Sequence, residues 1–411
     1  MLVLHESIKK QAKCRVELHV HLDGALRPET AWDLIKQKGL PLPGDGSLQA
    51  LTDALTPKEP TDLACFLKPF SIFLPALSGD LTAIRRVARE FVEDCSRELV
   101  AYCEARLCPQ LLMPLKMETP PVWAAAADHA NDANINGNTN GSQSQDVIAE
   151  QIVEAALAGI GEGEKTCPGT KVRLILCCIR GQPKWSAEIL QLCEKFKDSG
   201  VVGIDIAGSH HTASGGDTHS EGAEVFQEAA RRGVHRTVHA GEDAPAASVR
   251  AAIDDLKAER IGHGYRVLED ESTYQYCRGT HFEVCPTSSY LTGAISSLQL
   301  TSKRHPVLRF IEDDVSFSIN RDDPLLTATS LRDEYNLLAS WGCSEAVFAR
   351  ANFNAALHSF LPPAEKRELL RQLRDAYGVP DVDVRISDGD SGKAANLDKP
   401  CITVNTWENR T

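Results

Sequence analysis

Short apolar runs alternate with helical stretches along most of this chain, and the alternation limits the folds open to it. Residues 171–179 are almost continuously apolar, which is typical of a parallel strand covered on both faces. About eight such runs, joined by helices with right-handed crossovers, predict an α/β fold, a (β/α)8 TIM-type barrel. The predicted strands are 16–24, 100–108, 171–179, 201–208, 234–242, 261–264, 281–286 and 315–320, and the predicted helices are 28–39, 81–97, 146–159, 186–198, 221–233, 247–260 and 363–377.

Two segments depart from this pattern. Residues 124–145 hold an alanine run followed by Asn, Gly, Ser and Gln, which cannot anchor a core, so we expect a surface excursion there. The polar tail at 381–411 is expected to be disordered. The remainder, 1–380, is predicted to be one barrel domain with that excursion inserted in it.

An aromatic stripe lies within residues 61–74. Phe66, Leu67, Phe70 and Phe73 recur there at helical spacing. On pattern alone such a stripe belongs to a core more often than it faces a ligand. A second interpretation, an apolar lid over a pocket, stays open at this point.

Charge and cysteine content narrow the classes of function. A formal net charge of -13 argues against a nucleic-acid partner, because such proteins cluster Lys and Arg. The 13 cysteines include no C-x-x-C motif and several lie in predicted strands, so we expect buried, reduced thiols. No apolar run has the length of a signal-peptide core or a membrane span. We therefore expect a cytoplasmic monomer that binds a small molecule.

Two histidines end the first predicted strand. His19 and His21 are two positions apart, so on a strand both imidazoles leave the same face and can bind one ion. Asp23 and Gly24 follow at once, which suits a strand turning into a loop over a pocket. An isolated His-x-His also arises by chance in a half-buried strand, so the pair alone decides nothing.

Further polar residues end other predicted strands, at the edge where a barrel carries its active site. His239 and Glu242 end the fifth strand, His263 the sixth, and Asp322 and Asp323 the eighth. Each has an ordinary structural explanation, such as a backbone-satisfied histidine or an aspartate helix cap. Together they supply imidazoles and a carboxylate, a set that suits Zn2+ with one position open for water.

Five motifs closely resemble the adenosine deaminase family, in the same order and spacing from about residue 16 to about 377. They are LHVHLDG at 18–24, TVHAGE at 237–242, RIGHGY at 260–265, CPTSSYLTGA at 285–294 and SINRDDP at 318–324. The resemblance implies a zinc-dependent hydrolase with one zinc per chain that converts adenosine, and 2'-deoxyadenosine, to inosine or deoxyinosine. It implies zinc ligands at His19, His21, His239 and Asp322, catalytic roles for Glu242, His263 and Asp323, and substrate contacts from Asp23, His21, Gly208 and Asp323.

The implied chemistry agrees with the residue types. Displacing ammonia from C6 of a purine needs a nucleophile strong at neutral pH, which zinc supplies by acidifying water. The ring must also accept charge, so Glu242 has to arrive protonated and donate to N1, while Asp323 donates to N7. His263 is expected to orient the attacking oxygen. These roles require a dry pocket that raises the carboxyl pKa values.

Some positions depart from the family pattern, and other functions remain open. Ser209, His210 and His211 stand where relatives usually carry acidic residues, and Arg321 adds a cation beside the site aspartates. Asp23 favours a nucleoside, since adenine deaminases carry Glu there and the N6-methyl-AMP branch Asn. The alternatives are a non-catalytic binding or growth-factor-like module and a barrel hydrolase of an ester or amide, which commonly holds a second metal with a carbamylated lysine or a carboxylate.

Overall fold

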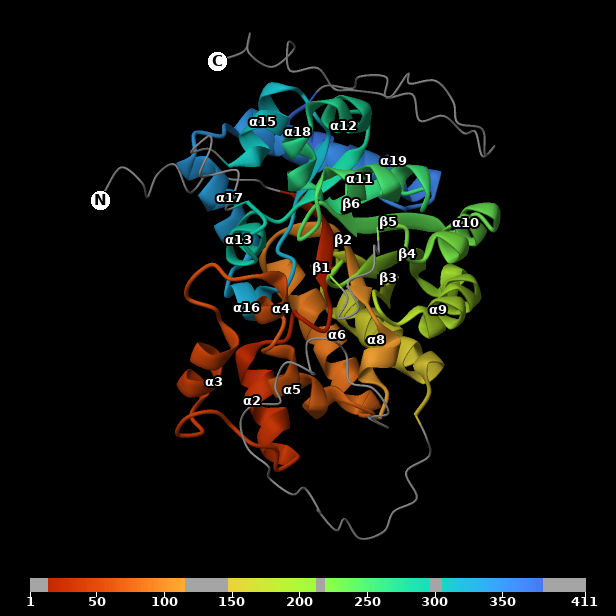
Figure 1. Ribbon diagram of the computed structural model, residues 1–411. Helices are drawn as coiled ribbons and strands as arrows, with labels where there is room; N and C mark the ends of the chain where they lie inside the picture. The colour runs from red at the N-terminus through yellow and green to blue at the C-terminus, as the bar shows by residue number, and fades with distance from the viewer. Residues whose placement is uncertain (1–13, 115–146, 212–218, 296–304, 380–411) are drawn as a thin grey trace, which may run out of the picture.

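The computed structural model describes residues 14–114, 147–211, 219–295 and 305–379. Eight strands lie side by side in chain order, every neighbouring pair from β1 to β8 is parallel, and the helices lie outside them (Figure 1). This confirms the predicted (β/α)8 barrel. The strands are β1 Arg15–His21, β2 Val100–Leu107, β3 Lys171–Ile179, β4 Val201–Ala207, β5 His235–Ala240, β6 Arg260–His263, β7 His281–Val284 and β8 Phe317–Ile319.

Helices follow the strands, and several connections between strands contain more than one helix. The chain forms α2 to α6 between β1 and β2, and further helices follow β7 and β8. The helices are α2 Pro28–Gln37, α3 Leu48–Leu55, α4 Leu63–Phe66, α5 Phe70–Leu77, α6 Leu81–Arg97, η2 Pro109–Leu112, α8 Ala149–Thr166, α9 Pro183–Phe196, η3 Lys197–Ser199, α10 Ala223–Arg231, α11 Ala246–Asp254, η4 Tyr265–Glu269, α12 Glu271–Cys277, α13 Pro286–Leu291, α15 Pro306–Glu312, α16 Pro324–Thr327, α17 Leu331–Ser340, α18 Glu345–His358 and α19 Pro363–Tyr377.

Helix α8 runs further than the sequence predicts. The expected end was Gly159, because glycine usually stops a helix, but α8 continues to Thr166. A Cβ atom at Gly159 would lie 2.2 Å from the backbone oxygen of Arg85, and one at Gly163 would lie 2.5 Å from Cβ of Val92. The glycines therefore allow α8 to pack closely against α6 and do not end it.

The aromatic stripe at 61–74 is not one helix. It divides into α4 and α5, with Pro69 immediately before α5. Proline has no N–H to donate and restricts the residue before it, so a continuous helix is disfavoured here. Asp62 caps α4 by accepting a hydrogen bond from the N–H of Cys65 at 2.7 Å. Residues of both short helices line the same cavity.

Other helix bounds differ from the expectation by a few residues. Helix α9 begins at Pro183 rather than residue 186, and α11 ends at Asp254 rather than residue 260. Helices α6 and α19 match the predicted 81–97 and 363–377. The predicted excursion at 124–145 and the tail at 381–411 lie outside the described residues. Within the described ranges no helix has the length and apolarity needed to cross a bilayer.

Candidate active site

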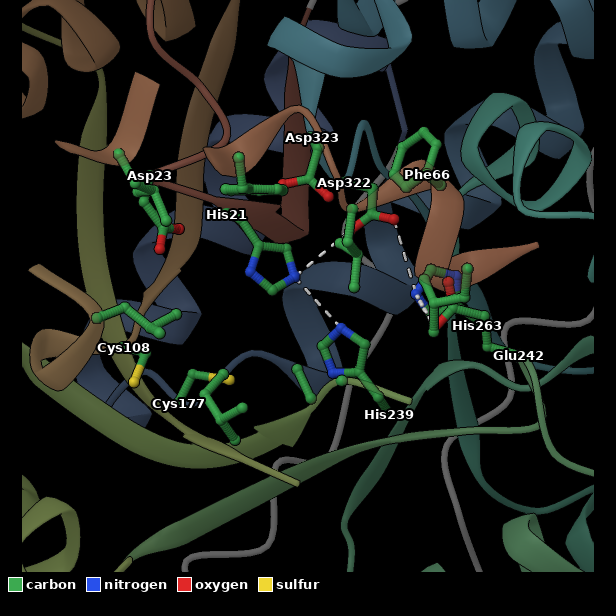
Figure 2. Close-up of a pocket in the computed structure, with 18 residues that line it drawn as sticks. His21, Asp23, Phe66, Cys108, Cys177, His239, Glu242, His263, Asp322 and Asp323 are labelled. Carbon is green, nitrogen blue, oxygen red and sulfur yellow. Dashed lines mark hydrogen bonds and ion pairs between the residues drawn. The ribbon is translucent and has the colours of Figure 1, made fainter. Parts of the chain in front are cut away.

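The four expected metal ligands come together at one end of the barrel. His19 and His21 lie at the end of β1, His239 in β5 and Asp322 after β8. Figure 2 shows the rings of His21 and His239 facing each other, with their Nε2 atoms 3.3 Å apart. The Oδ1 atom of Asp322 is 3.2 Å from Nε2 of His19 and 3.5 Å from Nε2 of His21. Asp322 therefore lies close to both imidazoles of β1, and His21 lies close to His239.

The spacing of these atoms fits a zinc ion. Bonds of about 2.0–2.1 Å in a tetrahedron place neighbouring ligand atoms about 3.3 Å apart. The contacts of His21 with His239 and Asp322 have nearly this length, at 3.3 and 3.5 Å. The buried Nε2 atom of His19 has no hydrogen-bond partner among the described residues, as expected of a nitrogen that binds a metal. The residues present are therefore the donor set that zinc takes.

His263 lies at the edge of this group. Ligand atoms of His19, His239, His263 and Asp322 all lie within 4.8 Å of one another. The Nε2 atom of His263 is 3.7 Å from Oδ2 of Asp322, a longer contact than His21 makes with the same aspartate. It is also 3.7 Å from a carboxylate oxygen of Glu242. His21 makes the shorter contacts with His239 and Asp322, whereas the four-residue group contains His263 in its place, and His263 lies between Asp322 and Glu242.

Buried carboxylates hold the far sides of two imidazoles. Nδ1 of His19 lies 2.8 Å from Oε2 of Glu283, and Nδ1 of His239 lies 2.9 Å from Oδ2 of Asp205. Arg106 donates to both, at 2.7 Å to Asp205 and 2.8 Å to Glu283. Burial alone would raise the pKa of Glu283, but positive charges led by Arg106 outweigh it and hold that pKa well below its usual value. Ionised carboxylates accept each Nδ1–H, so Nε2 is free to bind a metal.

Three carboxyl groups line the cavity in surroundings that favour their protonated forms. Burial raises the pKa of Glu242 well above its usual value, and the charge of Asp322 raises it further. The same two causes raise the pKa of Asp323. Burial raises the pKa of Asp23 to about 7. One oxygen each of Asp23 and Asp323 is buried without a hydrogen-bond partner among the described residues, so a ligand can satisfy it.

The backbone at the site is unusual in two ways. His263 and Asp322 have left-handed backbones, with φ of 61° and 65°. Strain of this kind clusters at functional sites, where the surrounding structure holds it. A Cβ atom at Gly24 would lie 1.9 Å from Oδ1 of Asp323, and one at Gly262 would lie 2.9 Å from Cε1 of His19. Glycine at these two positions makes room for an acid and for a ligand ring.

These groups open onto a cavity with about 700 Å³ of empty space. Phe66, Leu67 and Phe70 line one wall, and Gly208 stands after β4 on another part of the lining. Phe66 is only 1% exposed, so the stripe is at once buried and part of the cavity wall. Closure over a ligand remains a prediction. The apolar lining comprises Leu63, Phe66, Leu67, Phe70 and Leu74 on one side and Cys108, Leu111, Cys177, Ile179 and Ala207 on the other.

The departures noted in the sequence lie beside the ligand group and not in it. His210 is buried, with Nδ1 2.9 Å from Oδ1 of Asp243, and Nε2 of His211 lies 3.0 Å from the backbone oxygen of Asp243. Neither histidine belongs to the metal-binding groups found among the described residues. The guanidinium of Arg321 pairs with Glu17, with Nη2 lying 2.6 Å from Oε2.

The charged residues behind the proposed ligands were not predicted from the sequence. Arg106, Asp205 and Glu283 are fully buried, and each lies in a strand that otherwise has mainly apolar residues. A buried charge in an apolar strand is rare unless it is paired, so these three were the available signal. Cys108 and Cys177, which line the cavity in Figure 2, carried no signal, because a cysteine in a strand is ordinarily core.

A parallel barrel with a buried His/Asp metal-binding group at the carboxyl ends of its strands has the architecture of the metal-dependent barrel hydrolases. The family model described as adenosine deaminase matches residues 14–376. The chain is 41% identical over 368 residues to the adenosine deaminase of Gallus gallus, covering 89% of this chain and 96% of that protein. It is 42% identical over 371 residues to that of Bos taurus, covering 90% and 95%. The chain belongs to the adenosine deaminase family.

A solved structure supports the fold independently. An amidohydrolase from Burkholderia ambifaria, determined with bound zinc, superposes with a TM-score of 0.71 at 21% identity, covering 92% of this chain and 95% of that one. At that level of identity the likeness concerns the fold alone. It agrees with the barrel described above.

Proposed function

We propose that the protein catalyses the zinc-dependent hydrolytic deamination of adenosine, and of 2'-deoxyadenosine, to inosine or deoxyinosine and ammonia. Membership of the adenosine deaminase family supports the reaction. One observation carries the proposal: Glu242, whose pKa is raised by burial, lies beside the His/Asp group on the wall of the cavity.

One zinc ion would be held by His19, His21, His239 and Asp322. When bound, zinc lowers the pKa of a coordinated water, so that water attacks at neutral pH. Glu283 and Asp205 would fix the rings of His19 and His239 through their Nδ1 atoms. These contacts orient the ligands before the metal arrives.

The acids would handle the protons of the purine ring. As the water oxygen bonds to C6, Glu242 donates its proton to N1, so the electron pair of the C6–N1 bond moves onto that nitrogen. Asp323 in its acid form donates a hydrogen bond to N7, and the backbone N–H of Gly208 donates to the purine. His263, between Asp322 and Glu242, orients the attacking oxygen and stabilises its charge. Of the two protons of the water, one passes to N6, so that ammonia leaves with the electron pair of the C6–N6 bond, and the other returns to Glu242, while the oxygen stays on C6 as the carbonyl of inosine.

The sugar end of the substrate would lie toward Asp23, with His21 also contacting the substrate. Asp23 lines the cavity with a buried, unpartnered oxygen, which suits a hydrogen bond with the 5'-hydroxyl. A nucleoside supplies that hydroxyl, whereas a free base lacks it and a nucleotide would bring a charged phosphate to a buried carboxyl. Asp23 therefore favours adenosine over adenine and over N6-methyl-AMP.

Two other functions are less well supported. A non-catalytic binding protein would have no use for a protonated carboxyl beside a metal-binding group, yet Glu242 occupies that place. A barrel hydrolase of an ester or amide commonly holds a second metal with a carbamylated lysine or a carboxylate, and the lysine form would need a lysine at the site. No lysine lines the cavity in the described part of the chain.

The proposal extends to the setting of the reaction. We assign the enzyme to purine nucleoside salvage in the cytoplasm, acting as a monomer without a nucleic-acid partner. The net charge of -13 agrees with the last point, and the described cysteines are free thiols, as in a reducing compartment.

Conversion of the purine ring by the protein, followed by ultraviolet absorbance, tests the proposed function, since N6-methyl-AMP would release methylamine in place of ammonia. Metal-free protein would be reloaded with one equivalent of zinc and given adenosine, adenine or N6-methyl-AMP at equal concentrations. We expect inosine and ammonia from adenosine, and at least a hundredfold lower rate with the other two substrates. No turnover of adenosine by the zinc-loaded protein would refute the proposal, and faster turnover of adenine would reassign the substrate.

A further inference from the structure

The barrel closes between β8 and β1 in a different way from its other strand pairs. The two strands share a single bridge, between Val20 and Asp322, in place of a ladder. Asn320 closes part of the seam, because its Oδ1 accepts hydrogen bonds from the N–H groups of Leu18 at 2.8 Å and His19 at 3.1 Å. Asp322 closes the rest, because its backbone oxygen accepts a hydrogen bond from the N–H of His21 at 2.8 Å. The seam thus joins the two segments that carry three of the four proposed ligands.

Arg321 lies between those two closing residues, and Glu17 binds it at three points. The backbone N–H of Arg321 donates to Oε1 of Glu17 at 3.0 Å. Its Nε donates to the same oxygen at 2.9 Å, and its Nη2 donates to Oε2 at 2.6 Å. Glu17 is fully buried and Arg321 is 3% exposed. A planar guanidinium on a carboxylate in two parallel hydrogen bonds has one preferred geometry, so the pair fixes position as well as charge.

The far side of the guanidinium is held as well. It donates to Oε1 of Glu98 at 3.0 Å, and its centre lies 5.7 Å from the centroid of the Phe91 ring. Both partners belong to α6 or the residue after it. Arg321 therefore anchors the seam to the helix layer outside the barrel.

Asp322 needs such an anchor. Its φ of 65° is unfavourable for a residue with a side chain, so the surrounding structure must hold it. Glu17 holds Arg321, the residue before Asp322, by both its backbone N–H and its side chain. The carboxylate itself accepts a hydrogen bond from Ser288 at 2.6 Å. Glu17 is two residues before His19, and Arg321 is one residue before Asp322, so the pair ties one ligand segment to the other.

We propose that Arg321, through Glu17, is a positioning residue that sets the place of Asp322 relative to His19 and His21. This inference rests on the zinc site of the proposed function. Arg321 does not touch the cavity; it acts through the backbone of the seam. Loss of the pair should loosen the carboxylate and weaken zinc binding, while leaving the substrate walls in place.

A simpler explanation is that Arg321 only neutralises the buried charge of Glu17. The two explanations separate in a double variant. If charge alone matters, removing both charges restores the protein, because no buried ion is then left unpaired. If position matters, the double variant regains stability but still binds zinc weakly.

The experiment compares Arg321→Met, Arg321→Lys, Glu17→Gln and Glu17→Gln/Arg321→Met with the wild type, each as the full chain. The zinc dissociation constant is measured by competition with a chromophoric chelator, and the thermal midpoint is measured on metal-free protein. We expect Arg321→Met to raise the zinc dissociation constant by about 10–100-fold, as changes behind metal ligands typically do. With saturating zinc, kcat should fall more than KM changes. The lysine variant should be intermediate, since an ammonium makes one contact where the guanidinium makes several.

Arg350→Met is the matched control. Arg350 is buried and pairs with Asp314, a residue that also has a positive φ, of 58°, but precedes β8 at its opposite end. We expect this variant to lower the thermal midpoint while its zinc dissociation constant stays within about twofold of wild type. Equal weakening of zinc binding by Arg350→Met would overturn the inference, because the effect would then follow from destabilisation.

The remaining outcomes are also decisive. A double variant that binds zinc weakly although its thermal midpoint has recovered supports the positioning role. A double variant that binds zinc as tightly as the wild type overturns it. Wild-type protein that binds no zinc would overturn the proposed function together with this inference, whereas tight zinc binding by both wild type and Arg321→Met would overturn this inference alone.

Discussion

The Nδ1 atom of His239 lies 2.9 Å from a carboxylate oxygen of Asp205, which orients the ring so that Nε2 faces His21. The first residue belongs to β5 and the second to β4. The direction of a proposed ligand is therefore set by the neighbouring strand. We therefore predict different effects on zinc binding for substitutions of the two residues.

Substituting His239 by alanine should abolish tight zinc binding. The variant keeps two imidazoles and one carboxylate, one ligand fewer than the proposed set. Metal analysis after dialysis against a chelator should find zinc in the wild type and little in the variant. Full retention of zinc by His239→Ala would remove this histidine from the ligand set.

Substituting Asp205 by asparagine should weaken zinc binding without abolishing it. The amide oxygen still accepts a hydrogen bond but lacks the charge that makes the imidazole more basic, and Arg106 loses one of its two carboxylate partners. We expect the zinc dissociation constant to rise by about 10–100-fold. Chelator competition measures it, and Cys177→Ser, at a cysteine beside Asp205, serves as a nearby control that keeps the carboxylate.

Glu242→Gln separates proton donation from metal binding. The amide keeps the shape and a hydrogen-bond donor but removes the transferable proton, whose transfer stabilises mainly the transition state. We expect kcat to fall by about 10²–10⁴-fold with near-normal KM and normal zinc content. A variant that deaminates adenosine within about threefold of wild type would refute the role. Loss of zinc would instead make Glu242 a ligand.

Phe66→Ala tests the lid. The side chain is 1% exposed and lines the cavity, so its removal both opens the wall and deletes core contacts. If α4 and α5 close over the purine, KM should rise and kcat should fall, because water then enters the site. Phe73→Ala is the matched control, since Phe73 is fully buried but does not line the cavity. Equal effects of both substitutions on stability, with KM and kcat unchanged in Phe66→Ala, would make the stripe core only.

Glu334 predicts a pH dependence of stability. It is fully buried, accepts hydrogen bonds from the N–H of Thr287 at 3.0 Å and the hydroxyl of Thr329 at 2.8 Å, and burial raises its pKa to about 7. Its ordinary pKa is lower, so between about pH 4.5 and 7 the folded state holds more protons than the unfolded state. The free energy of unfolding should therefore fall as pH rises through this window, by up to about 3 kcal/mol from this group.

The matching variant is Glu334→Gln, which is neutral at every pH. Denaturant unfolding at pH 5 and pH 8 should find the variant gaining stability relative to wild type as pH rises. The absolute difference at one pH includes a changed hydrogen bond to Thr287 or Thr329, so the change between the two pH values is the measured quantity. A constant difference would mean that Glu334 titrates at the same pH in the folded and unfolded states.

The barrel and the convergence of the site could be predicted from the sequence because both depend on local patterns. Apolar runs such as β3 are periodic enough to place a strand, and the carboxyl ends of parallel strands meet in space. His239 and Asp322 could thus be brought together before their distance was known. Residues whose roles depend on contacts across the barrel could not. Arg106 has two partners 99 and 177 positions away, and no local pattern encodes such a pairing.

Glycine and proline account for most of the differences. Gly159 indicates a helix end in isolation but serves as a point of close contact with α6, which only the packing of the two helices reveals. Pro69 divides a stripe whose spacing alone predicts one helix. Arg321 was recognisable as unusual, yet its partner Glu17 lies 304 positions away. The missing information is in each case tertiary.

Asn320 accepts two hydrogen bonds from the backbone of β1, and these bonds fix the register of that strand against the last one. A shift of β1 by one residue would turn every side chain of the strand to the opposite face, so His19 and His21 would leave the site together. Loss of a single codon within the first half of that strand should therefore inactivate the enzyme even if it folds. A codon lost from a loop that only joins helices to strands would leave all the ligands in register. Changes in length should therefore be tolerated in such loops, whereas every strand that carries a site residue, β1, β5 and β6 among them, must keep its register.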